Sequence, residues 1–285
     1  MKEKLRQLRA FLRPLTEQGA ALAFSGGVDS TLLLAVLSEM RKEKPFPLLL
    51  LTAVSTLQPP CDLEAVKKIS EKYGLAVDFL HCDVLALEQV RINDPLRCYY
   101  CKKLLFETML SYAGSKGITT LLEGSHGDDL KTYRPGKKAL EELGVVSPLA
   151  LLGITKKEIR AMAEMLNVEC SNKPSSPCLA TRFDYGTVLT EADLARVGAG
   201  EAVLRTLLGE KADLRLRVHG NLARIEVTPA FFSLILDKHA EIAEKLKQLG
   251  FEKVTLDLAG FASGSYDGKL KEVKNVGTGK IESFH

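Results

Sequence analysis

A pair of glycines between an apolar run and a helix-like stretch constrains the fold of this chain more than any other feature. The string Ser25-Gly26-Gly27-Val28-Asp29-Ser30 follows the apolar residues 20–24 and precedes residues 31–40, which are rich in helix formers. A strand that ends in glycines brings backbone N–H groups close to a ligand, because no side chain stands in front of them. The positive end of the following helix faces the same point. This pattern predicts an anion cradle of the size of pyrophosphate, in which Asp29 caps the helix or helps to hold Mg²⁺.

The periodicity of the chain changes near residue 185. Before it, short apolar runs alternate with amphipathic stretches, which predicts an α/β fold with a parallel sheet and helices on both faces. After it, two alternating runs flank the hairpin turn Gly220-Asn221, which predicts a smaller C-terminal α+β domain. We therefore expect domains at residues 1–185 and 186–268 and a polar tail at 269–285. The expected strands are 20–24, 46–54, 76–82, 119–122, 214–219, 222–227 and 253–258, and the expected helices are 31–40, 62–73, 102–113, 156–166, 190–208 and 231–249.

Composition argues against several classes of protein. The chain has 285 residues, 39 basic and 36 acidic side chains, a net charge of +3 and no Trp. That balance suits the binding of small anions and gives little support for a broad nucleic-acid surface, which needs clustered Lys and Arg. The N-terminus lacks the apolar core of a signal peptide, and the longest apolar run, residues 47–54, is too short to span a bilayer. We expect a cytoplasmic protein whose six cysteines are reduced or bind a metal.

Three of the cysteines lie near positively charged residues. Cys98 and Cys101 form a C-x-x-C pair at an expected helix start, and Cys178 lies in a proline-stiffened segment that continues with Arg182. The pair alone is compatible with a structural zinc half-site, a redox pair or two inert thiols. Three cysteine ligands would bind a [4Fe–4S] cluster and leave one iron open to an exogenous ligand such as sulfide.

A structural zinc site would need a fourth protein ligand. No second C-x-x-C pair supplies one, which leaves His81 and His126 as candidates. The other cysteines have no supporting pattern, and we expect Cys61, Cys82 and Cys170 to be structural.

Charged residues alternate along the expected hairpin. Arg215 and Arg217 occupy one strand at a spacing that places both on one face, and Arg224 and Glu226 lie on the paired strand. Arginine forks match the geometry of a phosphate. A solvated hairpin face with an Arg–Glu pair is at least as consistent with the residues alone, and His219 either helps to bind the phosphate or is a satisfied hairpin residue.

The loop at residues 123–129 follows an expected strand end, where ligands gather in open α/β sheets. We assign Gly124 and Asp129 to the nucleotide site, with Asp128 or Asp129 assisting Mg²⁺ or a ribose. Solvated loop caps are the simpler interpretation of these carboxylates.

The chain resembles the LarE family of PP-loop ATP pyrophosphatases over nearly its whole length. A plain Gly-Gly turn with a helix cap would explain one or two residues of the first motif but not the whole string. The resemblance rests on residues 25–30, Tyr99-Tyr-x-Lys-Lys103, Tyr133-Arg-Pro-Gly136, the segment 178–186, Arg215-Leu-Arg217-Val-His219, Ala223-Arg-Ile-Glu226 and residues 254–264. It departs from the family at Lys131-Thr132 and at His126-Gly127, which puts an acidic role of this loop in doubt.

The resemblance implies an ATP-dependent sulfur transferase of nickel-pincer cofactor synthesis. Such an enzyme adenylates a carboxylate of pyridinium-3,5-biscarboxylic acid mononucleotide, and sulfur then replaces AMP to give a thiocarboxylate. In one branch the cysteine at position 178 gives up its own sulfur and becomes dehydroalanine. Cys98 and Cys101 match the other branch, in which three thiolates hold a [4Fe–4S] cluster that carries sulfide. We assign Cys178 and Arg182 as catalytic, and Arg215, Arg217, Arg224 and Glu226 as the substrate-phosphate pocket. The resemblance also implies a homo-oligomer, with a hexamer as one form, that binds neither nucleic acid nor membrane.

Three other functions compete with this hypothesis. A tRNA thiolation enzyme shares the PP-loop and the three cysteines, but would ordinarily carry paired zinc modules or a basic extension. An amide-forming synthetase would not need the cysteines. A non-catalytic adenine-nucleotide sensor would need neither the cysteines nor the arginine hairpin.

Overall fold

The computed structural model describes residues 1–59, 61–131, 135–168, 177–209 and 212–262. Contacts within the chain divide it into two compact units. Residues 1–180 and 185–194 form the first unit, and residues 181–184 and 195–285 form the second. The chain thus changes units more often than a single boundary at residue 185 implies, because Phe183 bridges Val218 of the second sheet. The expected tail at 269–285 lies outside the described residues.

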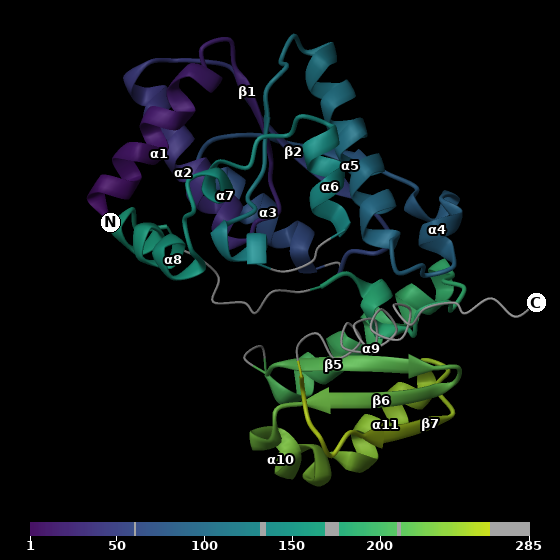
Figure 1. Ribbon diagram of the computed structural model, residues 1–285. Helices are drawn as coiled ribbons and strands as arrows, with labels where there is room; N and C mark the ends of the chain where they lie inside the picture. Colours follow the sequence, from purple (N-terminus) through teal and green to yellow (C-terminus); the bar gives the residue numbers. More distant parts are fainter. Residues whose placement is uncertain (60, 132–134, 169–176, 210–211, 263–285) are drawn as a thin grey trace, which may run out of the picture. The chain divides into compact units, whose positions relative to one another are not determined.

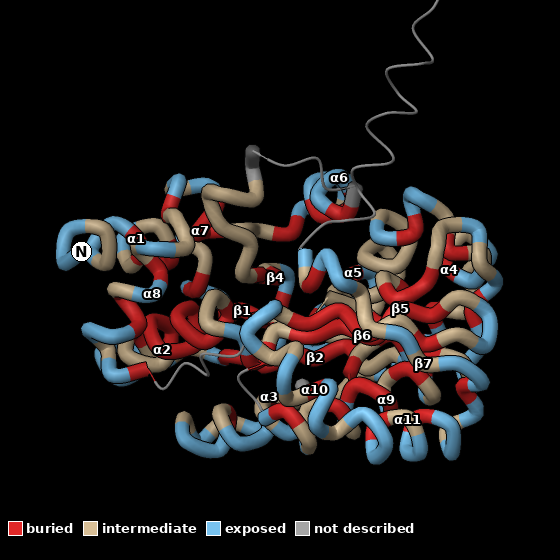
Figure 2. Tube along the Cα trace, turned by 90° about the horizontal axis from the view of Figure 1, so that it is seen from below, coloured by how far each residue is buried: buried red, intermediate tan, exposed pale blue. Residues whose placement is uncertain are grey.

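A parallel four-stranded sheet forms the centre of the first unit, which confirms the predicted α/β class. Its strand order is β3-β2-β1-β4, and Leu22 of β1 pairs with Leu50 of β2 and Leu122 of β4. Residues of β1, β2 and β4 are largely buried (Figure 2), as expected for strands that are covered on both faces. The bounds are β1 Ala20–Ala23, β2 Leu48–Val54, β3 Val77–His81 and β4 Leu121–Leu122.

Helices cover both faces of this sheet (Figure 1). The connections β1–α2–β2 and β2–α3–β3 run in one direction across the sheet and the connection through α5 runs back, so right-handed crossovers place α5 on the face opposite α2 and α3. No helix within the described parts of the chain is long and apolar enough to cross a membrane. The bounds are α1 Lys2–Leu15, α2 Val28–Glu43, α3 Cys61–Lys72, α4 Glu88–Arg91, α5 Arg97–Ser115, α6 Pro135–Glu142, α7 Pro148–Leu151 and α8 Lys156–Met165.

Helix α5 begins five residues before the expected start at Lys102, so the C-x-x-C pair lies within its first five residues. The residue before the helix, Leu96, makes no side-chain capping bond, and therefore no capping signal marked the start in the sequence. The preceding Asp94 holds the entry instead: its carboxylate accepts from the amide of Leu96 at 2.6 Å and its carbonyl from the amide of Arg97 at 2.8 Å.

The second unit contains the three-stranded sheet β5-β6-β7. Gly220, at φ +60°, forms the predicted turn between the antiparallel strands β5 and β6, and β7 pairs with β6 in parallel. The single helix expected at 231–249 is two helices, with a break between Asp237 and His239. At this break the His239 ring donates to the Leu236 carbonyl at 2.7 Å. The bounds are α9 Glu191–Leu208, which starts in the first unit, β5 Leu214–His219, β6 Leu222–Val227, α10 Phe232–Asp237, α11 His239–Gln248 and β7 Lys253–Leu256.

The predicted capping box opens helix α8. The Thr155 hydroxyl accepts from the amide of Glu158, and the Glu158 carboxylate accepts from the amide of Thr155 at 2.9 Å. The same carboxylate pairs with Lys4 of α1 at 2.8 Å. The hydrogen bonds from Lys4, the Thr155 amide and the Thr155 hydroxyl lower the pKa of Glu158 to about 2.

This lowered pKa makes the contribution of Glu158 to stability depend on pH. The ionised carboxylate contributes fully above its ordinary pKa of 4.5, and the contribution is lost as the pH falls from 4.5 through about 2. We therefore expect Glu158→Gln to lower the free energy of unfolding at neutral pH, and the difference from wild type to shrink across that window in urea denaturation. Glu164→Gln, on the exposed side of the same helix, is the control. A deficit of Glu158→Gln that stays constant down to pH 2 would contradict the assignment.

Candidate functional site

The turn between β1 and α2 requires glycine at the first of its two Gly positions. Gly26 has a φ of +70°, and a Cβ there would lie 3.1 Å from the Val66 side chain and 3.3 Å from its amide nitrogen. Gly27 precedes α2 in an extended conformation, and its carbonyl accepts from the amide and the hydroxyl of Thr31 at 2.9 and 2.8 Å. Thr31 is therefore the residue at which the helical hydrogen bonds begin. The amides between Gly27 and Thr31 are the N-terminal set that a helix leaves for capping groups or ligands.

The two serines of the turn hold its shape. Their hydroxyl oxygens lie 3.1 Å apart, and the Ser30 hydroxyl also donates to the Gly27 carbonyl at 3.1 Å. The Ser25 hydroxyl accepts from the amide of Gly27 at 3.4 Å. In this state the hydroxyls that the sequence suggested as ligand donors serve the cradle itself.

The loop that follows β4 packs on the first turn of α2. A Cβ at Gly124 would lie 3.1 Å from the amide nitrogen of Ser30 and 3.3 Å from the Cβ of Asp29, so only glycine permits this approach. Glu123 is buried and anchors the loop by accepting from the amide and the hydroxyl of Ser125, both at 2.9 Å, and from the Ser147 hydroxyl. The structure thus places Gly124 beside the glycine-rich turn, and its role toward a nucleotide stays a prediction.

Both aspartates of this loop have structural contacts. Asp129 accepts from the amide of His126 at 3.2 Å, and Asp128 accepts from the amide of Lys156 at the start of α8 at 2.8 Å. These contacts match the simpler interpretation of the two carboxylates as caps. A role of Asp129 toward a nucleotide stays a prediction.

A lysine that the sequence did not single out lies at the cradle. The amine of Lys156 is 2.7 and 2.6 Å from the two carboxylate oxygens of Asp29. The Asp29 side chain therefore does not cap the helix. Its negative charge in the anion cradle is neutralised by Lys156. The capping box marks the helix start in the sequence, but no local pattern relates Lys156 to a residue 127 positions earlier.

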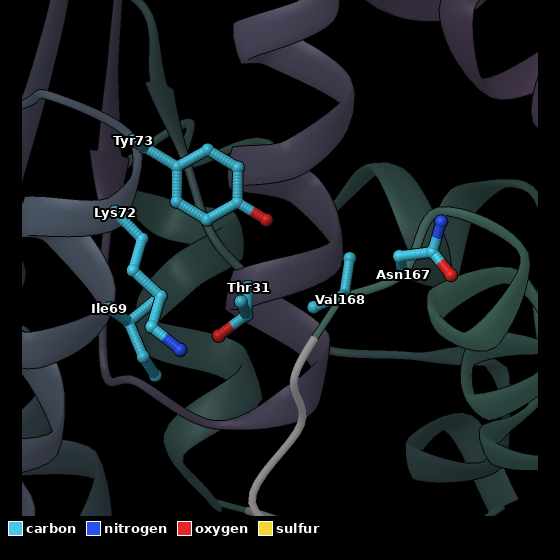
Figure 3. Close-up of a pocket in the computed structure, with 6 residues that line it drawn as sticks. All are labelled: Thr31, Ile69, Lys72, Tyr73, Asn167 and Val168. Carbon is cyan, nitrogen blue, oxygen red and sulfur yellow. The ribbon is translucent and has the colours of Figure 1, made fainter.

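A pocket of about 220 Å³ opens beside the first turn of α2 (Figure 3). Its lining combines the Lys72 amine and the Tyr73 ring with apolar side chains, and Thr31 forms part of its wall. The Thr31 hydroxyl is bonded to the Gly27 carbonyl at 2.8 Å, so the wall of the pocket and the glycine-rich turn share a residue.

Backbone hydrogen bonds bring the cysteine-bearing segments together at the carboxyl ends of β2 and β3. The amide of Cys82, directly after β3, donates to the carbonyl of Val54 at the end of β2 at 2.9 Å. The amide of Leu179, next to Cys178, donates to Leu57 just beyond β2 at 2.8 Å.

Asn93 links the turn before α5 to two points of the segment that follows Cys178. Its side-chain amide donates to Ala180 at 3.4 Å, and its carbonyl accepts from the amide of Gly186 at 3.3 Å.

The thiols gathered in this way include a fourth cysteine. Burial, followed by the neighbouring Cys178, Cys98 and Cys82, raises the pKa of the Cys101 thiol to about 12. Cys82 itself is only 9% exposed. The sequence indicates only a structural role for Cys82, because no other cysteine lies near it in the chain.

Arg97 lies beside these thiols and is almost completely buried, with 6% of its surface exposed. Its guanidinium stacks on the Tyr185 ring at 4.7 Å from the centroid. Burial lowers the pKa of Arg97, but the negative charges available at Cys98, Cys178 and Tyr185 outweigh this effect and raise it. Its Nε and Nη1 atoms are buried and have no hydrogen-bond partner within the described residues.

The donor set fits an iron–sulfur cluster in kind. Cys98, Cys101 and Cys178 are the thiolate ligands such a cluster takes, and the buried Arg97 cation would balance its negative charge. In the described part of the chain no three Cys, His, Asp or Glu side chains already stand at metal-binding distances, so binding would require the thiols to rotate toward a common centre.

In the second unit, Arg182 and Arg217 form buried ion pairs. Arg182 donates to both carboxylate oxygens of Glu201 at 2.8 Å, and Arg217 donates to Glu226 at 3.0 Å and to the Thr181 carbonyl. Arg224 also approaches Glu226, at 3.2 Å, and Asp257, at 3.5 Å. Arg215 and Arg217 face Glu226 and Arg224 across the β5–β6 ladder, as the alternation predicts. This face is buried rather than solvated, because Arg215 is 5% and Arg217 is 1% exposed.

Arg215 differs from its neighbours because it makes no ion pair within the described residues. Its guanidinium lies 5.0 Å from the centroid of the Phe261 ring. Burial and the charges of Arg217 and Arg182 lower the pKa of Arg215 to about 10. It stays charged at neutral pH, and an anion would relieve the repulsion.

Comparison with known proteins gives the two units a common family. Residues 1–133 match the model of a PP-loop domain. The chain is 33% identical to the pyridinium-3,5-bisthiocarboxylic acid mononucleotide synthase of Lactiplantibacillus plantarum, over 90% of this chain and 92% of that protein. It belongs to the LarE family. An uncharacterized protein of Synechocystis sp. is 36% identical over 93% of this chain and 97% of its own length.

A more distant relative shares only part of this LarE chain. The tRNA-cytidine(32) 2-sulfurtransferase of Bdellovibrio bacteriovorus is 27% identical over 107 residues, which cover 37% of this chain and 41% of that enzyme.

The position of Lys156 generates a prediction about nucleotide binding. Phosphate oxygens at the α2 amides would compete with Asp29 for the amine, and a hydrogen bond between charged groups contributes about 1.5–3 kcal/mol. We expect Lys156→Met to weaken MgATP binding in calorimetric titration roughly 10- to 100-fold. The neighbouring Lys157→Met is the control, because Lys157 is exposed. Equal losses of MgATP affinity in the two variants would contradict a specific contact between Lys156 and the phosphates.

Proposed function

We propose that this protein is an ATP-dependent sulfur transferase of nickel-pincer cofactor synthesis. It adenylates a carboxylate of pyridinium-3,5-biscarboxylic acid mononucleotide and replaces AMP with sulfur to give a thiocarboxylate. The observation that carries the proposal is the gathering of thiols at the carboxyl ends of β2 and β3, in the same unit as the PP-loop turn. The 33% identity to the synthase supports the choice of substrate, because it extends over 90% of the chain and thus over both units.

The first step is attack of the substrate carboxylate on the α-phosphorus of ATP, with pyrophosphate leaving. The α2 amides and Lys156 bind the phosphates, and the helix dipole stabilises their charge. With Lys156 turned to the phosphates, Asp29 would be free to hold Mg²⁺, the second of the two roles expected for it from the sequence. Ser25, Gly26, Gly27, Ser30 and Gly124 shape the cradle.

The second step displaces AMP with sulfur. Cys98, Cys101 and Cys178 would hold a [4Fe–4S] cluster, which when bound supplies an iron open to an exogenous sulfur ligand. In this proposal Cys178 is a ligand and keeps its sulfur.

Arg215 binds the phosphate of the mononucleotide. It is the cation of its group without an ion pair in the described residues, whereas Arg217 and Arg224 pair with Glu226 and orient the face around it. Arg182 donates to Glu201 through Nε and Nη2 and to the Thr181 hydroxyl through Nη1, so its catalytic role stays a prediction that these contacts do not by themselves support.

An anaerobic assay with ATP, sulfide and the dicarboxylate mononucleotide tests the proposal. We expect pyrophosphate release that depends on the mononucleotide, a product with the mass of the thiocarboxylate, and an unchanged mass of the Cys178 peptide. Conversion of Cys178 to dehydroalanine would contradict the cluster, and activity with tRNA in place of the mononucleotide would contradict the substrate. Iron and sulfide analysis after anaerobic reconstitution tests the cluster separately, and zinc as the sole metal would exclude it.

Arg215→Ala separates substrate recognition from ATP use. One charged hydrogen-bonding partner of a phosphate contributes about 1.5–3 kcal/mol, so we expect KM for the mononucleotide to rise roughly 10- to 100-fold. MgATP affinity should not change, because the cradle lies in the other unit. Arg205→Ala, on the same unit and half-buried, is the matched control. Loss of both MgATP binding and substrate use would indicate misfolding instead of a lost phosphate contact.

A further inference from the structure

Arg97, whose charge would balance that of a bound cluster, has buried donor groups that no described residue accepts from. It is the first residue of α5 and is 6% exposed, and its Nε and Nη1 atoms have no acceptor within the described residues. Burying a charged group whose donor atoms lack acceptors is unfavourable, so a cation in this state marks a place that an anion completes.

The other buried arginines of the chain show the contrast. Arg182 and Arg217 are each bonded to a carboxylate, Glu201 and Glu226 respectively. Arg97 makes no ion pair with a carboxylate in the described part of the chain. The groups that face it are the thiols of Cys98 and Cys178 and Tyr185, which it contacts through the ring and through a side-chain hydrogen bond. The site is therefore cationic and lined by soft, polarisable groups.

We propose that Arg97 forms a binding site for hydrosulfide, the anionic sulfur donor of the transfer step. The proposal rests on the sulfur transfer proposed above and adds the sulfur substrate and the residue that binds it. Hydrosulfide is a small, polarisable monoanion, and it matches a site with one cation, single N–H donors and sulfur neighbours.

The particular donor atoms that lack acceptors favour a small anion over a carboxylate or phosphate. Oxyanions bind a guanidinium through two donors on one edge, and Arg182 uses Nε and Nη2 in this way toward Glu201. The unsatisfied atoms of Arg97 are Nε and Nη1, which do not form that edge. An anion that accepts single hydrogen bonds therefore fits this site better than a bidentate oxyanion.

The chemistry balances without an oxidant or reductant. Hydrosulfide supplies the sulfur and the electron pair of the new C–S bond to the adenylated carboxyl carbon. The C–O bond to AMP breaks, and AMP leaves with the electron pair of that broken bond. The proton on sulfur passes to water.

Anaerobic equilibrium dialysis of the full chain with radiolabelled hydrosulfide tests the site directly. We expect wild type to bind one hydrosulfide that bromide displaces, and Arg97→Gln to lose this binding at least tenfold. Arg97→Lys should retain part of it, because the charge remains. Arg91→Gln is the matched control, since Arg91 is an exposed arginine on the neighbouring helix α4.

A second measurement does not depend on how the variants fold. In crystals of the wild-type protein soaked in bromide, we expect an anomalous peak within hydrogen-bonding distance of Arg97 Nε or Nη1. Unchanged hydrosulfide binding by Arg97→Gln, displacement by inorganic phosphate in preference to bromide, or absence of the bromide peak would each overturn the proposal.

The outcomes also separate this inference from the function on which it rests. If pyrophosphate release depends on the mononucleotide but hydrosulfide binding does not depend on Arg97, the function stands and the site fails. If wild type binds hydrosulfide through Arg97 but shows no reaction with the mononucleotide, the site stands and the substrate assignment fails.

Discussion

The close approach of two chain segments at the β1–α2 turn is the constraint on which the first unit depends. Gly26 takes a left-handed conformation against the backbone of Val66, and Gly124 lies against Ser30. A side chain at either glycine would push α3 or the loop after β4 away from the start of α2. Because parallel strands end at one edge of a sheet, the turn, this loop and Cys82 after β3 all lie at that edge. The packing that forms the anion cradle thus also determines where the thiols gather.

The buried cations of the chain fall into two groups. Arg182 and Arg217 are bonded to carboxylates, and such pairs orient the backbone more than they add stability. Arg97 and Arg215 have no such pair in the described residues and are buried beside aromatic rings. A protein tolerates the cost of an unpaired buried charge where a ligand offsets it. This difference separates the two arginines that we propose to bind anions from the two that pair with carboxylates of the protein, although nothing in the sequence distinguishes the four.

Local signals predicted much of the fold, and distant contacts explain what they missed. The glycine pair, the Thr155–Glu158 capping box and the Gly220 turn each lie within a few residues, so their geometry follows from the sequence. The short helices α4, α6 and α7 carry too few residues for a periodic pattern. Lys156 at Asp29 and Cys82 beside Cys101 are products of the sheet order. Strand order brings together residues whose separation in sequence gives no sign of it.

The extent of each similarity indicates which unit determines which part of the chemistry. The PP-loop match ends at residue 133, before Cys178 and before the arginine hairpin. It therefore supports only the assignment of the nucleotide cradle. The tRNA sulfurtransferase covers 37% of the chain, whereas the mononucleotide synthase covers 90% and includes the second unit. ATP chemistry is therefore the property shared most widely. In the function that we propose, the choice of acceptor depends on the buried arginine face of β5 and β6, because Arg215, which has no ion pair within the described residues, suits a phosphate ester.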